Sequence, residues 1–340
     1  MASVFDLGLI TKREVRAMIK NVSATLTRSD IIGAWKARFG IGRMSYIVPP
    51  GLYSIGNPRS DSPVLVSANY KLTFDELRKN LSELDCWLLI LDTKGINVWC
   101  AAGKGTFGTE ELVNRLQLVG LEKIVSHKNL ILPQLGAPGV NSNEVRKRTG
   151  FSVIFGPVRA EDIQEFILAG NIATKEMRLV NFTFKDRLVL TPMELVPAIK
   201  KSLPIVGSLF VANLFAKRPF DKHDLMAYTG AVLAGSVITP LLLPCIPGKA
   251  FAWKGWVAGL LVTACLLWKS KRCNLIKAGW LLLFPAISSF LAMIFTGAST
   301  YTSPSGVKKE MQKAVPLIAT AAAIGAAIML GVHFFGRREK

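Results

Sequence analysis

Cysteine and histidine are scarce in this chain of 340 residues, which contains five cysteines and three histidines. The cysteines lie far apart and include no Cys-x-x-Cys pair. A disulfide framework, a zinc site and an iron–sulfur cluster held by this chain alone are therefore not expected. Any electrons that its chemistry requires must come from another protein.

Acidic residues are also few, 23 against 42 lysines and arginines, which gives a formal net charge of +19. The excess is concentrated late, because residues 191–340 carry 17 basic and 5 acidic side chains. Basic residues that border apolar segments typically face the headgroups of acidic lipids. Since they do not alternate with aromatic side chains on one predicted face, the charge indicates membrane lipids as partners rather than a nucleic acid.

Long apolar runs are absent from the first 200 residues and frequent afterwards. One of these runs, Ser202–Ala216, is shorter than the others and is interpreted either as a tilted span or as an interfacial helix; it is called the fifth run below. No acidic residue interrupts the long runs, so an ion-coupled transporter is not expected. Four runs have about the length of 20 residues that crosses a bilayer, namely Leu225–Ile246, Phe251–Trp268, Leu275–Phe295 and Val315–Phe335.

The distribution of basic residues favours four crossings with both termini in the cytoplasm. If the fifth run does not cross, 12 basic residues fall on the side of the first domain and 5 on the other side, whereas the counts become 7 and 10 if it crosses. Met1–Leu9 lacks the basic start of a signal peptide and carries Asp6. We therefore expect a multi-pass protein of the inner (cell) membrane with its first domain in the cytoplasm.

Strand and helix patterns alternate between residues 63 and 170, as a parallel α/β sheet requires. Trp87–Leu91 predicts a buried strand and Thr109–Val119 a helix. The sequence thus predicts a Rossmann-like, parallel-sheet α/β domain followed by an all-α transmembrane helix bundle. The predicted parts are N-terminal helices near Thr11–Lys20 and Asp30–Phe39 with a covering loop (1–62), the α/β domain (63–170), a linker (171–200) and the transmembrane domain (201–340).

One stretch, Asn97-Val98-Trp99-Cys100-Ala101-Ala102-Gly103-Lys104, needs a specific chemical explanation. It follows the predicted strand Trp87–Leu91, at an edge where open α/β sheets present their binding loops. Small residues follow Cys100, so its sulfur can face a bulky, flat ligand. The alternative is an inert, packed thiol, which is the usual state of a lone cysteine.

Two nucleotide-binding motifs compete for the same residues. Gly103–Gly108 satisfies the pattern G-x-G-x-x-G, but its first glycine does not directly follow the strand, so a dinucleotide-dependent oxidoreductase is a weak alternative. A phosphate-binding P-loop is excluded, because Val98 replaces its first glycine and Gly105 its magnesium-binding hydroxyl residue.

The signature resembles that of the corrinoid protein of the mercury-methylating pair, a relative of the corrinoid-binding domain of the corrinoid iron–sulfur protein. The resemblance covers about residues 25–170 and includes Ser62–Lys71, Leu91–Ile96, Gly105–Glu110, Leu132–Gly139 and Gly156–Arg159. It implies that Cys100, on a short cap helix, is the catalytic residue and the lower axial ligand of a corrinoid cobalt.

The candidate cofactor-binding residues are the rest of the signature and three glycines at predicted strand ends, where a ligand rim forms. We expect Asn97 to cap the helix, Trp99 to pack inward, and the small residues to admit the macrocycle. The full set is Asn97, Val98, Trp99, Cys100, Ala101, Ala102, Gly103, Lys104, Gly136, Gly139 and Gly156.

The resemblance also implies a function, namely a membrane-anchored, corrinoid-dependent methyltransferase that transfers a cobalt-bound methyl group to inorganic Hg(II). A soft thiolate ligand increases electron density on the methyl group, which suits a soft acceptor. The implied partners are a ferredoxin-like iron–sulfur protein as electron donor and a folate-linked methyl donor. The alternative is a corrinoid methyl carrier of one-carbon metabolism with another acceptor.

Overall fold

The computed structural model describes residues 19–216, 220–268, 270–299 and 303–335. The helix expected near Thr11 therefore lies outside the described residues. The chain divides into two compact units. The α/β unit comprises the described residues up to Val180 except Arg38–Gly40, and the helical unit comprises Arg38–Gly40 and the described residues from Asn181 onward.

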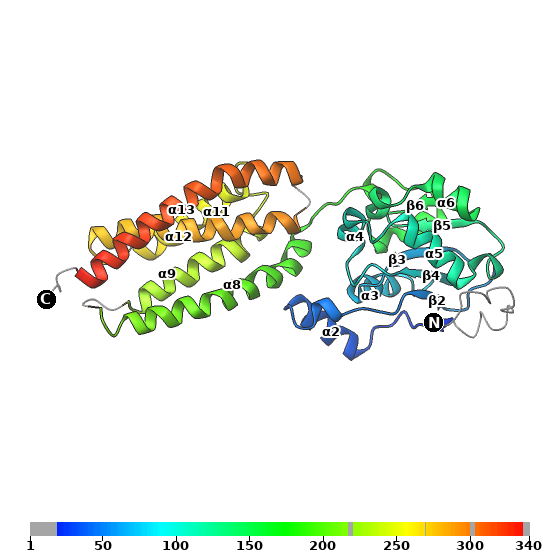
Figure 1. Ribbon diagram of the computed structural model, residues 1–340, viewed down its shortest axis with the longest axis horizontal. Helices are drawn as coiled ribbons and strands as arrows, with labels where there is room; N and C mark the ends of the chain where they lie inside the picture. Colours follow the sequence, from blue (N-terminus) through cyan, green and yellow to red (C-terminus); the bar gives the residue numbers. More distant parts are fainter. Residues whose placement is uncertain (1–18, 217–219, 269, 300–302, 336–340) are drawn as a thin grey trace, which may run out of the picture. The chain divides into compact units, whose positions relative to one another are not determined.

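A six-stranded sheet forms the centre of the α/β unit (Figure 1). The strands lie in the order β1-β2-β4-β3-β5-β6. Strands β4, β3, β5 and β6 are parallel to one another, and β1 is parallel to β2, whereas β2 and β4 are antiparallel. All residues of β3 and β4 are buried, as expected for central strands that are covered on both faces. The strands are β1 (Lys20–Asn21), β2 (Gly51–Ile55), β3 (Val64–Ala68), β4 (Cys86–Leu91), β5 (Asn129–Leu132) and β6 (Ser152–Phe155).

Helices cover both faces of this sheet, so the α/β class predicted from the alternating pattern is confirmed. One apolar layer joins the sheet to α5 through residues such as Leu89 and Leu112, and the other joins it to α3 and α7 through Phe74 and Phe166. The helical segments are α2 (Arg28–Arg38), η1 (Arg43–Ser45), α3 (Lys71–Lys79), α4 (Val98–Lys104), α5 (Thr109–Val119), η2 (Leu121–Lys123), η3 (Gln134–Gly139), α6 (Ser142–Thr149), η4 (Ala160–Asp162), α7 (Ile163–Leu168) and η5 (Glu176–Arg178).

One edge of the sheet differs from the prediction. Residues 51–55 were expected in a covering loop, but they form β2, which pairs antiparallel with β4. Pairing with a strand that is already buried overrides the loop signal of the flanking glycine and proline residues, because it satisfies the backbone groups of β2.

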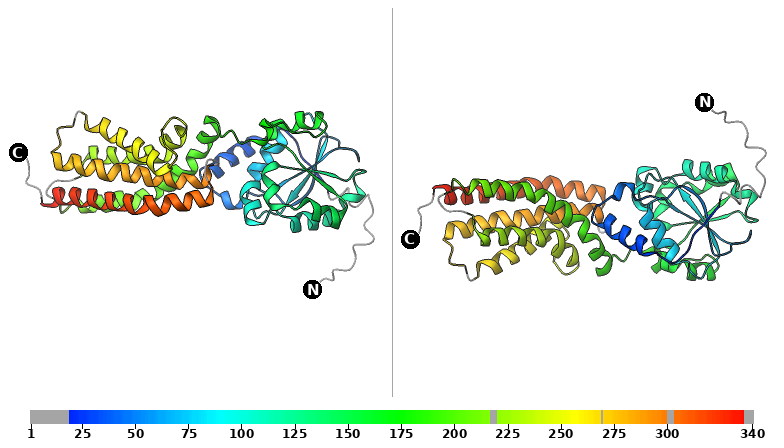
Figure 2. Two further views of the ribbon diagram at one scale, coloured as in Figure 1. Left: turned by 90° about the horizontal axis from the view of Figure 1, so that it is seen from above. Right: turned by 90° about the horizontal axis from the view of Figure 1, so that it is seen from below.

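The helical unit consists of helices that run along a common axis, and both views of Figure 2 agree on this arrangement. Their contacts are most extensive between α11 and α12 and between α12 and α13. The segments are α8 (Phe184–Ala212), α9 (Lys222–Leu233), the π-helix η6 (Ala234–Ile238), α10 (Thr239–Leu241), α11 (Phe251–Leu267), α12 (Asn274–Ile294), η7 (Phe295–Ala298) and α13 (Pro304–Phe335).

Among the described residues, four helical stretches of this unit qualify as membrane spans by length and composition. Three of them overlap predicted runs, namely Leu225–Ile246, Leu275–Phe295 and Val315–Phe335, and the fourth is α8 in place of Phe251–Trp268. Helix α8 qualifies, because a capping box of Thr183 and Asp186 starts it well before the short run Ser202–Ala216. Helix α11 contains only 17 residues and falls among the shorter apolar helices. The candidate spans are Phe184–Ala212, Lys222–Leu241, Asn274–Gly297 and Ser305–Phe335.

Candidate functional site

The signature forms helix α4, whose start and end are fixed by local chemistry. The side-chain oxygen of Asn97 accepts a hydrogen bond of 2.9 Å from the backbone N–H of Cys100, so the predicted N-cap is confirmed. At the other end, Gly105 adopts a left-handed conformation with φ of 79° and closes the helix. The capping of both ends gives a helix of only seven residues a defined position.

The helical period divides α4 into a buried and an exposed face. Val98, Ala101 and Ala102 are buried against the sheet, whereas the side chain of Trp99 is 39% exposed. Cys100 is also exposed, so the structure does not support a packed thiol. The expectation that Trp99 packs inward is wrong, because Val98, Ala101 and Ala102 occupy the inner face of the helix.

The second cysteine of the α/β unit has the opposite environment. Cys86 begins β4 and is completely buried. Burial, followed by the nearby charge of Asp85, raises the pKa of the Cys86 thiol to about 12. Cys86 is therefore a protonated core residue, and Cys100 is the thiol that is presented to solvent.

Two of the candidate glycines permit a close backbone approach beneath α4. A Cβ atom on Gly139 would lie 2.1 Å from the carbonyl oxygen of Phe107 and 3.1 Å from the Cα atom of Ala102. A Cβ atom on Gly136 would lie 2.5 Å from the ring of Phe107. These glycines allow η3 to support α4 from below.

The third candidate glycine, Gly156, follows β6 and is buried. A Cβ atom at this position would lie 3.1 Å from Ile131 and 3.4 Å from Phe166. Contacts within the protein thus explain why positions 136, 139 and 156 favour glycine. The signature residues that remain exposed to a ligand are Trp99, Cys100, Gly103 and Lys104.

Asn69 organises the loop that leads into α4, a role that sequence reasoning missed. Its side chain is buried, and its Oδ1 atom accepts hydrogen bonds from the backbone N–H groups of Thr93 (3.1 Å) and Gly95 (3.0 Å). Its Nδ2 atom donates to Asp92 at 3.2 Å. The only signal in the sequence is that Asn69 directly follows β3, at the edge of the sheet where the binding loops begin.

The acidic groups close to this loop are paired with basic side chains. A hydrogen bond from Lys94 lowers the pKa of Asp92 against the opposing effect of burial. Glu111 accepts a hydrogen bond of 2.8 Å from the backbone N–H of Asp92 and pairs with Arg115 at 2.7 Å. Within the described ranges, no three His, Cys, Asp or Glu side chains are grouped to hold a metal ion.

The comparisons with known proteins match the part of the chain that contains α4. Residues 40–167 match the family model described as CO dehydrogenase/acetyl-CoA synthase delta subunit. The acetyl-CoA decarbonylase/synthase complex subunit gamma of Methanopyrus kandleri is 34% identical over 122 residues, which are 35% of this chain and 26% of that protein. The subunit of the same name from Methanocaldococcus jannaschii is 32% identical over 127 residues, which are 37% of this chain and 26% of that protein. The chain thus spans about a quarter of the length of these curated relatives.

These names correct the resemblance proposed from the sequence. The family model and the curated relatives name subunits of acetyl-CoA synthase and acetyl-CoA decarbonylase/synthase, not the corrinoid protein of the mercury-methylating pair. The identification with the mercury-methylating pair is therefore wrong. The match covers the strands from β2 to β6 and both α4 and η3.

The dinucleotide alternative also lacks the geometry that it requires. Gly103 lies inside α4, and residues 92–102 separate it from the end of β4 at Leu91. In a dinucleotide fingerprint, the first glycine directly follows the strand and the helix N-terminus faces the pyrophosphate. The arrangement instead presents one thiol on the exposed face of a short, supported helix.

Proposed function

We propose that the α/β unit is a corrinoid-binding methyl carrier of one-carbon metabolism, with the Cys100 thiolate as the lower axial ligand of the cobalt. The exposed position of Cys100 on α4 carries this proposal. Because the described residues offer no group of three metal ligands, a metal that arrives with most of its own ligands suits the site. A corrin ring would supply four nitrogen ligands, so a single protein donor, the sulfur of Cys100, would be enough to hold the cobalt from the side of the protein.

The surface around Cys100 fits a large, flat group. A Cβ atom placed on Gly103 meets nothing within 4 Å, so the backbone is open to a ligand on that side. Trp99 adds a planar, apolar surface beside the thiol. Lys104, at the last turn of α4, is exposed and available to a polar substituent of the macrocycle.

The residues of the chain have separate tasks in this proposal. When bound, the corrinoid supplies a cobalt ion that accepts and releases a methyl group. Cys100 offers a soft sulfur donor to that metal. Asn97 and Gly139 hold the helix that carries the sulfur, and Asn69 holds the loop before it.

The names of the relatives support a place in one-carbon chemistry, since they are subunits of an acetyl-CoA decarbonylase/synthase complex. We propose a folate-linked (pterin) methyl donor upstream. The electron donor is a separate iron–sulfur protein, because the five cysteines are too dispersed to hold a cluster. In this scheme the chain is the methyl-transfer component of an enzyme system.

We further propose that the helical unit lies in the cell membrane and that the α/β unit lies in the cytoplasm. Only 6% of the most apolar window of α8 is buried within the protein, against 56% for Asn274–Gly297. Since α8 runs along the same axis as the other helices (Figure 1), it crosses the membrane if they do. If α11 is counted as well, although it has only 17 residues, the proposal gives five crossings and a C-terminus outside the cytoplasm, contrary to the count of basic residues.

Anaerobic purification of the full-length chain in detergent tests the cofactor. We expect one cobalt per chain after loading with a corrinoid, and a cobalt–sulfur bond in X-ray absorption spectra. Cys100→Ala removes the sulfur ligand, whereas the control Cys245→Ala, at an exposed cysteine of the helical unit, leaves it unchanged. Failure to bind a corrinoid, or a cobalt–sulfur bond that persists in Cys100→Ala, contradicts the proposal.

A reporter fused to the C-terminus tests the membrane topology. Five crossings predict activity of a reporter that functions only outside the cytoplasm. Activity of a reporter that functions only in the cytoplasm would contradict five crossings and support the four-crossing topology.

A further inference from the structure

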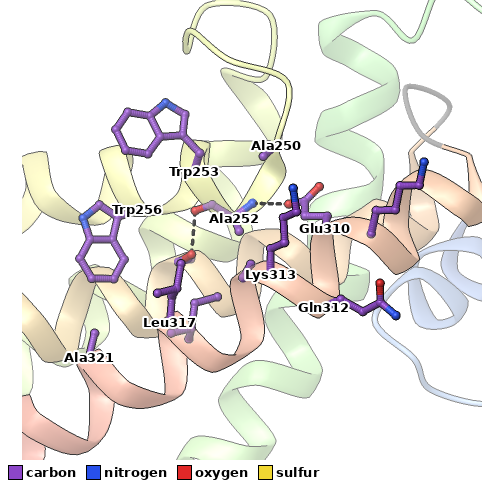
Figure 3. Close-up of a pocket in the computed structure, with 13 residues that line it drawn as sticks. Ala250, Ala252, Trp253, Trp256, Glu310, Gln312, Lys313, Leu317 and Ala321 are labelled. Carbon is purple, nitrogen blue, oxygen red and sulfur yellow. Dashed lines mark hydrogen bonds between the residues drawn. The ribbon is translucent and has the colours of Figure 1, made fainter.

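A groove between α11 and α13 opens on the side of the helical unit and has a volume of about 670 Å³ (Figure 3). This volume falls within the range of about 300–1,000 Å³ that is typical of ligand sites. Trp253 and Trp256 come from α11, and Leu317 and Ala321 come from α13. Ser289 of α12 also lines it.

One end of the groove is apolar and exposed. The side chain of Trp253 is 54% exposed and that of Leu317 is 72% exposed. Large apolar side chains that line a concave surface gain free energy when an apolar group covers them, at about 25 cal/mol per Å². Tryptophan is also enriched at the level of lipid headgroups.

The other end of the groove is basic. Lys309 and Lys313 lie one turn apart on α13 and line this end. Glu310 lies between them in the sequence, but its carboxylate accepts a hydrogen bond of 2.7 Å from the backbone N–H of Ala252, at the start of α11 (Figure 3). Its charge is therefore directed at the N-terminus of α11, and the two lysines are left to attract an anion.

This gradient from charge to apolar surface matches one class of ligand. A soluble anion would leave the tryptophans and Leu317 uncovered, and a neutral lipid would not use the lysines. We propose that the groove binds one anionic phospholipid, with its phosphate at Lys309 and Lys313 and an acyl chain along Trp256, Leu317 and Ala321. The inference rests on the membrane location proposed above and not on the corrinoid.

Lipid binding to the full-length chain in detergent tests this proposal by native mass spectrometry. We expect phosphatidylglycerol to bind more tightly than phosphatidylcholine. The double substitution Lys309→Gln and Lys313→Gln should weaken phosphatidylglycerol binding about 30-fold, because each lysine near an anionic group contributes roughly a factor of five. Phosphatidylcholine binding should change little.

Lys308→Gln is the matched control, because Lys308 is an exposed neighbour on the same helix that does not line the groove. Ala321→Trp fills the apolar end and should weaken the binding of both lipids. Equal affinity for the two lipids, an equal loss in Lys308→Gln, or unchanged binding in Ala321→Trp overturns the proposal. A chain that fractionates outside the membrane would instead contradict the membrane location, which separates the two failures.

Discussion

A guanidinium nitrogen of Arg78 on α3 lies 2.7 Å from a carboxylate oxygen of Asp30 on α2, which stands 48 residues earlier in the chain. Lys71 approaches the other oxygen of Asp30 at 2.6 Å, and Asp75 pairs with both cations. Since the four side chains are largely shielded from water, they form a clasp between α2 and the body of the α/β unit. We call this set the α2 clasp.

Asp30→Asn should reduce the free energy of unfolding of the α/β unit by about 3 kcal/mol, because it leaves two cations to share one carboxylate, that of Asp75, at a shielded site. Thermal unfolding of the detergent-solubilised chain measures this. The control Glu76→Gln removes an exposed carboxylate, 3.7 Å from Lys79 on the same helix, and should cost less than about 1 kcal/mol. Equal effects of the two substitutions would show that the clasp contributes nothing specific.

The α2 clasp should also make stability depend on pH. Burial raises the pKa of Asp30, but the hydrogen bonds from Lys71, Thr27 and Arg78 outweigh it and hold this pKa well below its usual range. The contribution of Asp30 is therefore present above its unfolded pKa of about 4 and is lost as the pH falls further. Unfolding midpoints should decline more steeply for the wild type than for Asp30→Asn as the pH falls below about 4, and the two curves should run parallel above that pH. Curves that run parallel below that pH as well would contradict this assignment.

Asn69→Ala should loosen the loop before α4, because the backbone N–H groups of Thr93 and Gly95 lose their buried acceptor. At about 1 kcal/mol for each hydrogen bond, amide exchange of each of these residues should become roughly fivefold faster, and corrinoid affinity should fall. Hydrogen exchange detected by mass spectrometry measures the first effect. Asn80→Ala, at the end of α3, is the control, and unchanged exchange in Asn69→Ala would exclude an organising role.

Gly139→Ala should shift α4, because the new methyl group would overlap the carbonyl oxygen of Phe107. We expect a loss of about 2 kcal/mol of stability together with weaker corrinoid binding. Gly103→Ala separates these two effects, since its methyl group meets no protein atom within 4 Å and alanine favours the helix. It should preserve stability and weaken corrinoid binding only. Full binding by Gly103→Ala would place the macrocycle elsewhere.

The two thiols of the α/β unit should differ in reactivity. Cys100 is exposed and should react with a maleimide in the folded protein, while Cys86 should react only after unfolding, because it is buried and its pKa is raised to about 12. Peptide mass spectrometry distinguishes the sites. A bound corrinoid should protect Cys100, and continued labelling of Cys100 in the loaded protein would argue against sulfur ligation.

The sequence predicted the elements whose signal is local. Strand β4 follows from an uninterrupted apolar run, helix α5 from its period, and the cap at Asn97 from one side chain that competes for backbone N–H groups. These features depend on neighbours within a few residues, which the sequence displays directly.

The remaining features depend on partners that are distant in the chain. Strand β2 is defined by its pairing with β4, and the role of Asn69 by a loop more than 20 residues later. Helix α4 is too short for its period to show which face is buried, so the exposure of Trp99 was missed. Three prolines inside α8 concealed its continuity.

The support of α4 has a consequence for how this site can change. Its position depends on the side chain of Asn97 and on the backbone contact between Ala102 and Gly139, and the side chain of residue 100 contributes to neither. The donor atom and its scaffold are thus separable. Under the proposed ligation of cobalt by Cys100, a codon change to histidine would exchange sulfur for an imidazole nitrogen on an unaltered frame. The electronic character of the bound metal would then be adjustable independently of the fold.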